Sequence, residues 1–158
     1  MDGSRVSRLL VLDDERTIAD TMCLIANQAG YEARPAYDHE SAIAIAHEYR
    51  PDFFIFGFNN GWGKNGCETA IELEGFLPQC VLALFSGSSA AAPVLEEYRQ
   101  RGREFQILPK PVHPQVFLDW LKSNGGRAGE KIMHNEFLVG SARVAPAWRG
   151  ILARLFGW

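Results

Sequence analysis

Apolar runs without polar alternation recur along the chain, and each predicts a strand buried on both faces, as in a parallel sheet covered by helices. The predicted strands are residues 9–12, 53–56, 81–85 and 105–108. A further short strand, residues 31–36, contains a proline and is therefore expected near a sheet edge. Between and after the strands, apolar residues recur at helical spacing, which predicts helices over residues 15–29, 38–49, 67–75, 90–101 and 114–123.

Residues typical of helix ends agree with these bounds. Gly30 is expected to stop the first helix, Asp38 to cap the second and Pro114 to begin the last. The side chains expected to face the sheet are Ile18, Met22, Ile25 and Ala29; Ala42, Ile45, Ala46 and Tyr49; Ala91, Val94, Leu95 and Tyr98; and Val116, Phe117, Trp120 and Leu121.

Strict alternation of strands and helices with short connections predicts one α/β domain over residues 7–124. Its expected form is a doubly wound, five-stranded parallel sheet in a flavodoxin-like three-layer sandwich. Residues 125–144 are interpreted as a linker, and residues 145–158 as a C-terminal amphipathic helix or tail.

Charge and cysteine usage narrow the functional classes. The net charge is -3, which gives no support to nucleic-acid binding. Residues 1–124 hold 11 Lys/Arg and 17 Asp/Glu, whereas residues 125–158 hold 5 and 2, so an acidic body carries a mildly basic tail. Three cysteines without C-x-x-C spacing fit reduced thiols, and neither a signal peptide nor a membrane-spanning run is evident. We therefore expect a cytoplasmic protein.

Polar side chains follow three of the predicted strands. Asp13 and Asp14 come after the first, Ser86 after the fourth and Lys110 after the fifth. Because the carboxyl ends of parallel strands meet at one edge of the sheet, these residues are expected to share a site. Two adjacent carboxylates are also typical Mg²⁺ ligands, although Asp14 and Ser86 could simply cap the helices that follow them.

The segment LLVLDDE, the Pro51-Asp52 pair, Ser86 and the Lys110-Pro111 pair together resemble a response-regulator receiver domain of two-component phosphorelay signalling, with a CheY-like fold. The resemblance implies a metal site made by Asp13, Asp14 and the backbone carbonyl of Asn59. It also implies that Ser86 and Lys110 contact a phosphoryl group on an aspartate that ends the third strand.

The sequence departs from this pattern at the phosphoacceptor. Counting from Pro51-Asp52, the equivalent position is Gly57, which has no nucleophile. Asp52 cannot replace it, because five residues at roughly 3.3 Å each place it about 16 Å away. The family's switch aromatic corresponds here to Ile107. We therefore predict an atypical pseudo-receiver, in which Mg²⁺ binding is weakened and Lys110 pairs permanently with the acids.

Two other functions remain open. The chain could be a receiver phosphorylated elsewhere, for example on Asp13 or Ser86. A phosphatase of the haloacid dehalogenase type also places an aspartate, a hydroxyl and a lysine after successive strands, but it requires Asp-x-Asp where this chain has Asp13-Asp14-Glu15. That reading is the least favoured, and no enzymatic activity is expected.

The expected partners are signalling proteins, either a histidine kinase or a downstream target, with a second copy of the chain also open. By resemblance, the partner surface surrounds the fifth strand, with Tyr98, Ile107 and Val112 as candidates. The tail offers a second apolar surface, because five large side chains fall at helical spacing: Trp148, Ile151, Leu152, Leu155 and Phe156. This helix could dock onto its own domain, onto a second protein or onto a second copy of the chain. Its few basic residues make a membrane-surface role less favoured than these.

Overall fold

The computed structural model describes residues 5–58, 65–87 and 91–125 of the chain. The strands are β1 (Arg8–Leu12), β2 (Glu32–Ala36), β3 (Phe53–Gly57), β4 (Val81–Ser86) and β5 (Gln106–Pro109). The helices are α1 (Arg16–Gln28), α2 (His39–Tyr49), α3 (Gly66–Phe76), α4 (Ala92–Gln100) and α5 (Pro114–Gly125). The predicted alternation of strands and helices is thus confirmed, with ends displaced by one or two residues.

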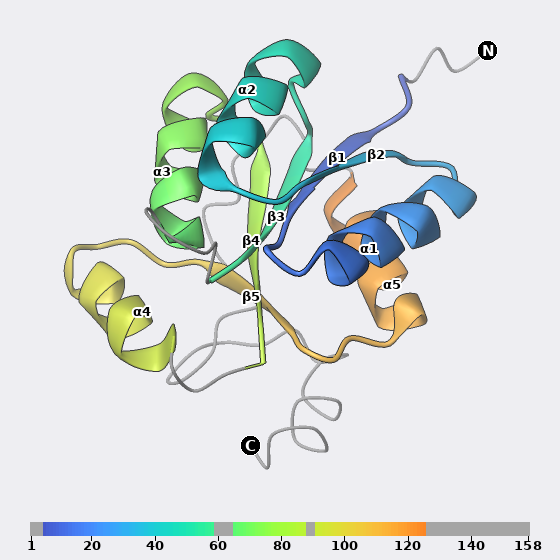
Figure 1. Cartoon of the computed structure of the whole chain (residues 1–158). Coiled ribbons are helices and arrows are strands. Elements are labelled where there is room, and N and C mark those ends of the chain that lie inside the picture. Colours follow the sequence, from blue (N-terminus) through green and yellow to red (C-terminus); the bar gives the residue numbers. More distant parts are fainter. Residues whose placement is uncertain (1–4, 59–64, 88–90, 126–158) are drawn as a thin grey trace.

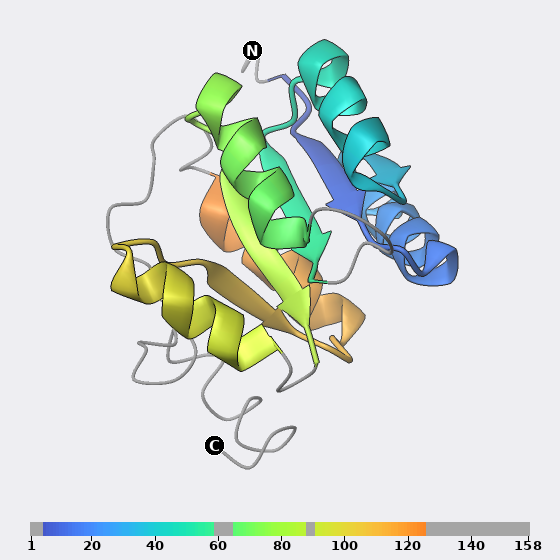
Figure 2. The ribbon, with the colours of Figure 1, turned by 60° about the vertical axis from the view of Figure 1, so that its left-hand side comes forward.

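The strands form a single parallel sheet in the order β2-β1-β3-β4-β5. This is the flavodoxin-like order, in which the chain reverses direction beside β1 and places helices on both faces. Figure 1 shows α1 and α5 on one side of the sheet and α2, α3 and α4 on the other. Figure 2 shows the same three layers from another side. The predicted fold class is therefore confirmed.

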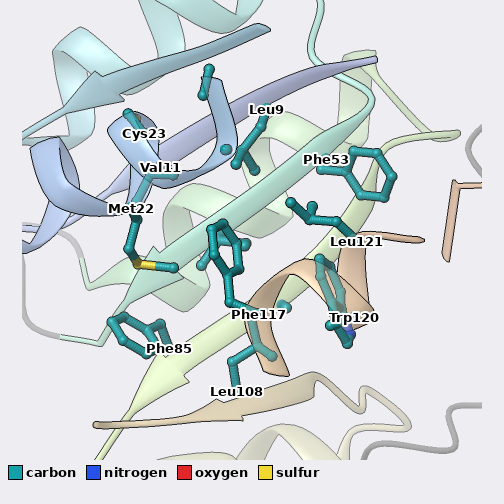
Figure 3. Close-up of a cluster of buried hydrophobic side chains, with 14 of the residues drawn as sticks. Leu9, Val11, Met22, Cys23, Phe53, Phe85, Leu108, Phe117, Trp120 and Leu121 are labelled. Atoms are coloured by element: carbon teal, nitrogen blue, oxygen red, sulfur yellow. The ribbon is translucent and has the colours of Figure 1, made fainter. Parts of the chain in front are cut away.

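Two apolar layers, one on each face of the sheet, hold the described part of the chain together. The layer under α1 and α5 contains Phe53, Phe117 and Trp120, all at most 1% exposed (Figure 3). The layer under α2 and α3 contains Phe54 and Phe56 from the same strand. Because β3 lies in the middle of the sheet and is apolar on both faces, it contributes to both layers.

Local sequence signals account for the helix ends. Gly30 has φ 97°, a left-handed conformation suited to glycine, just after α1. The Asp38 side chain accepts a hydrogen bond from the Ser41 N–H, 2.7 Å away, and so caps α2. Asn65 and Glu68 form a reciprocal capping box that begins α3.

The buried helix faces differ in part from the prediction. In α1 the buried residues are Ala19, Met22, Cys23 and Ala26, whereas Ile18 and Ile25 are half-buried and Ala29 is exposed. The helix thus turns its small side chains to the sheet and leaves the larger isoleucines at the side. In α2 and α5, Ile45 and Val116 are likewise half-buried, and α4 buries no residue completely, although Ala91 just before it is buried.

Both edge strands contain a proline. Pro35 lies in β2, as expected from its sequence, and Pro109 is the last residue of β5. Within the described residues, no helix is long and apolar enough to cross a membrane.

Candidate functional site

The carboxyl edge of the sheet gathers the polar residues singled out in the sequence. Asp13 follows β1, Gly57 and Ser86 end β3 and β4, and Lys110 follows β5. The strand register brings Gly57 opposite Phe85, and Ser86 opposite Pro109. Lys110 N–H also donates to the backbone oxygen of Ser86, at 3.2 Å. These four positions therefore lie along one edge.

Asp13 is a carboxylate with no solvent exposure. Its Oδ1 accepts a hydrogen bond from the Glu15 N–H at 2.9 Å, and its Oδ2 lies 2.7 Å from Lys110 Nζ. Burial of an ionised carboxylate is costly unless a cation and hydrogen bonds compensate it. Here both oxygens are engaged by donors, and Lys110 supplies the opposite charge.

Lys110 is held from two directions. Besides the bond to Asp13, its ammonium lies 4.9 Å from the centre of the Phe85 ring, in a cation–π contact. Its side chain is 25% exposed, so the pair is shielded on the Asp13 side and borders solvent on the Lys110 side. The predicted pairing is present in the structure, and it joins Lys110 to Asp13.

Gly57 is buried against this pair. A Cβ at position 57 would lie 3.1 Å from Asp13 Oδ2, the same oxygen that contacts Lys110. The backbone at Gly57 does not have a positive φ, so its conformation does not require glycine. A longer acidic side chain at this position would begin next to the ion pair and bring a second negative charge to it.

Two further glycines shape the site, although the sequence pattern did not mark them. A Cβ on Gly66 would lie 1.9 Å from the Gly57 carbonyl oxygen, so only glycine lets α3 begin so close to the end of β3. A Cβ on Gly87 would lie 2.6 Å from the carbonyl oxygen of Lys110. The sequence offers only a weak sign of these roles. Gly87 directly follows Ser86, and Gly66 is the last residue of a glycine-rich loop.

The residues present fit a Mg²⁺ site poorly. Asp14 is exposed, and Asn59 lies outside the described residues. Both Asp13 oxygens already have donors, and Gly57 offers no carboxylate. In the part of the chain that the structure describes, no group of three acidic, histidine or cysteine side chains is placed to hold a metal ion. Hard divalent cations usually take several oxygen ligands, and the described residues of this edge do not assemble such a set.

The remaining predicted residues occupy different environments. Pro111 follows Lys110 through a cis peptide bond and is exposed. Ile107 and Tyr98 are half-buried and pack on the α2–α3 side of the sheet, whereas Val112 packs on the α1–α5 side. The three candidate partner residues therefore do not form one face. The apolar tail residues, Trp148 to Phe156, lie outside the described residues.

Solved structures share this architecture. A CheY-like response regulator receiver domain protein from Methanospirillum hungatei superposes with a TM-score of 0.70 and 18% identity, covering 81% of this chain and 100% of its own. Chemotaxis protein CheY4 of Vibrio cholerae gives a TM-score of 0.66 and 22% identity, over 75% and 98% of the two chains. The fold is that of a response-regulator receiver domain.

This receiver fold also occurs as part of a longer chain. NtrX from Brucella abortus matches with a TM-score of 0.67 and 21% identity, over 78% of this chain but 28% of its own. No protein-family model matches the sequence. At these identities the likeness concerns the fold, and the chemistry of the receiver edge must be argued from the residues present.

Proposed function

We propose that this chain is an atypical receiver, a protein-interaction module of two-component signalling that has no phosphoacceptor at position 57. The observation that carries the proposal is the Asp13–Lys110 ion pair beside Gly57. In this reading, the lysine that would otherwise meet an incoming phosphoryl group is already engaged. The pair thus holds the edge of the sheet in one state.

Charge counting supports this function. The buried part of the site contains one carboxylate and one ammonium, which balance each other. An acceptor aspartate would add a second buried negative charge, and a divalent cation would be the usual means of offsetting it. With glycine there, the demand for a cation falls, so we propose weakened Mg²⁺ binding and no catalytic activity. A histidine kinase or a downstream signalling protein is the proposed class of partner.

The proposal is tested by restoring the missing carboxylate. Parent chain, Gly57→Asp and Gly57→Asn are each incubated with acetyl phosphate and Mg²⁺, and intact masses are measured. We expect a phosphoryl adduct on Gly57→Asp only, because the new carboxylate adds both the nucleophile and a second acidic Mg²⁺ ligand beside Asp13, and the backbone admits a side chain. Gly57→Asn is the matched control, since its side chain has the same size but no carboxylate nucleophile.

The same experiment separates the alternative in which another residue is phosphorylated. An adduct on the parent chain would contradict the proposal, and peptide mapping would then assign it to Asp13, Ser86 or another position. Lack of an adduct on all three proteins would show that the edge is no longer competent for phosphoryl transfer even with its carboxylate restored. That result would leave the pseudo-receiver function standing and remove the idea of an otherwise intact pocket.

A further inference from the structure

An apolar groove of about 340 Å³ lies between α1 and the segment that leads from β5 into α5. Its walls include Ile18 and Ile25 from α1 and Val112 and Pro114 from the opposite side. These isoleucines were expected to face the sheet, but they are half-buried beside the groove. The floor contains Phe117, which Figure 3 shows close to Met22 and Phe85 between the two helices.

This groove offers apolar surface for which the described residues supply no cover. Most of its lining is apolar, although Thr17, Thr21 and Lys110 also border it, and its volume is at the lower end of the range for ligand-binding pockets. A space of that size accepts one or two large side chains rather than a whole helix. The occupant must therefore present bulky apolar side chains from an otherwise separate segment.

We propose that the C-terminal segment of this same chain, residues 145–158, docks against the groove and inserts one or two side chains of its apolar stripe. The stripe, Trp148, Ile151, Leu152, Leu155 and Phe156, supplies large side chains at helical spacing, and a short amphipathic helix gains its stability from packing of this kind. The groove adjoins the site discussed above, because Phe85 and Lys110 also line it, but the docking does not require a phosphoacceptor at position 57.

The length of the chain permits this docking. Helix α5 begins at the groove with Pro114 and ends at Gly125, which is about 17 Å further along at 1.5 Å per residue. Residues 126–147 then have to return over this distance, whereas an extended chain covers about 3.3 Å per residue. A tethered segment also has a high effective concentration at its site, so a modest affinity suffices.

Charge favours the same occupant. Residues 125–158 hold 5 Lys/Arg and 2 Asp/Glu, against 11 and 17 in residues 1–124. Two exposed acids, Asp14 and Glu15, immediately precede α1 at the groove end of that helix. The cations nearby are Arg16, which begins α1, and Lys110, whose charge is balanced by Asp13. Arg149 and Arg154 lie off the apolar stripe of the tail, where they are available to meet acidic groups at the rim.

The test uses the full chain with a nitroxide spin label on Ala153→Cys, a tail position off the stripe. The native thiols of Cys23, Cys67 and Cys80 are buried, and burial raises the pKa of each, so labelling is directed to the new cysteine. Amide NMR signals are then compared between oxidised and reduced label. We expect strong broadening at Thr21, Ile25 and Val112, and little at α3 or α4.

Three variants sharpen the result. Leu152→Ser with Leu155→Ser should abolish the broadening, and Thr21→Arg, which places bulk and positive charge on the groove wall, should reduce it several-fold. Gln100→Arg adds the same charge on exposed α4, on the other face of the sheet, and should leave it unchanged. Both α1 and α4 positions are exposed, so neither variant disturbs the core.

Two outcomes would overturn the proposal. One is broadening that is absent from the groove or is unaffected by the Leu152 and Leu155 changes. The other is broadening in an equimolar mixture of labelled unenriched chain and unlabelled ¹⁵N chain, which would assign the groove to the tail of a second copy.

Discussion

The two partners of the Asp13–Lys110 ion pair differ in burial, so the loss of one has a different effect from the loss of the other. Asp13 is wholly buried and Lys110 borders solvent, so loss of the lysine leaves a charge in the interior, whereas loss of the aspartate leaves a cation that can reach water. Lys110 therefore matters to the stability of this edge mainly because it compensates the buried charge of Asp13, and less because the pair itself is strong.

We expect Lys110→Met to lower the free energy of unfolding by about 2–4 kcal/mol, because Asp13 would be buried without its cation. The double variant Asp13→Asn with Lys110→Met should lose less than the single one, since the uncompensated charge is gone. Urea denaturation measures both, with Lys122→Met on exposed α5 surface as the control, expected within about 0.5 kcal/mol of the parent. Equal losses for the single and double variants would contradict this account.

Glycines at the site differ in how strictly they are required. Gly57→Ala should change stability by less than about 1 kcal/mol, because its Cβ would meet Asp13 Oδ2 at 3.1 Å, a contact that a small side-chain shift relieves. Gly87→Ala should cost about 2–3 kcal/mol, since its Cβ would meet the Lys110 backbone at 2.6 Å. Thermal or urea unfolding of the two variants provides the comparison, and the reverse order would show that the edge of the sheet adapts freely.

Residue by residue, the site was predictable where it depends on strand ends and not where it depends on close backbone contact. Asp13 and Lys110 could be placed together because parallel strands bring their carboxyl ends to one edge. Gly66 and Gly87 could not be found this way, because each approaches a carbonyl of another element, on Gly57 and Lys110 respectively, and nothing in the sequence marks such an approach.

At the scale of elements, the beginning of α2 links stability to pH. The Ser41 backbone N–H donates to Asp38, and this hydrogen bond holds the pKa of the carboxyl below its ordinary value of 3.8. A carboxyl with a depressed folded-state pKa stabilises the fold above its unfolded pKa, and this contribution disappears as pH falls through the folded pKa.

We therefore expect the parent to be more stable than Asp38→Asn at pH 7, by about 0.3–1 kcal/mol from the interaction of the charge with the helix dipole. The difference should shrink as the pH is lowered below about 4, because the parent carboxyl then becomes neutral like the amide. Urea unfolding at a series of pH values measures this difference. A constant gap from pH 7 to pH 3 would indicate that the charge at Asp38 contributes nothing.

Helix α1 shows what periodicity alone does not determine. Spacing predicted the right helix and the burial of Met22, but the face turned to the sheet is centred on Ala19, Cys23 and Ala26. Small side chains allow close approach of a helix to a sheet, and this packing preference overrode the size of Ile18 and Ile25. Periodicity therefore predicts that a helix has an apolar face better than it predicts which side chains on that face pack against the sheet.

For the whole molecule, the two apolar layers share the strands of one sheet, so we expect them to unfold together. Cys23 lies in the α1–α5 layer and Cys67 in the α2–α3 layer, and burial is the main cause that raises the pKa of each thiol to about 12. Since the thiolate is the reactive form, both should be nearly inert to Ellman's reagent in the native protein at pH 8.

In increasing urea, the two thiols should become reactive at the same midpoint, as for a two-state domain. Because Cys80 also becomes reactive on unfolding, Cys23→Ala and Cys67→Ala are each made in a Cys80→Ala background, which leaves one thiol in one layer. If Cys23 reacted at clearly lower urea than Cys67, the helices on its side of the sheet would be separating first, and the single cooperative unit would be ruled out.

The general fold was predictable because three of the five strands, β1, β3 and β4, contain uninterrupted apolar runs, and alternation with helices leaves few topologies. Which residues share a partner surface was less predictable from the sequence. Tyr98 and Ile107 lie on one side of the sheet and Val112 on the other, because α4 precedes edge strand β5 on one face and the chain then continues to α5 on the other. Sequence distance alone could not reveal that separation.

The prolines of β2 and β5 have a consequence for self-association. An exposed strand margin can recruit another chain through its unpaired amide groups, and this is a frequent route to aggregation. Pro35 and Pro109 each remove one such amide from the two outer strands, and both strands are short. A continuous sheet running through two molecules is therefore disfavoured, and any pairing of copies would have to be made by side chains on the helices.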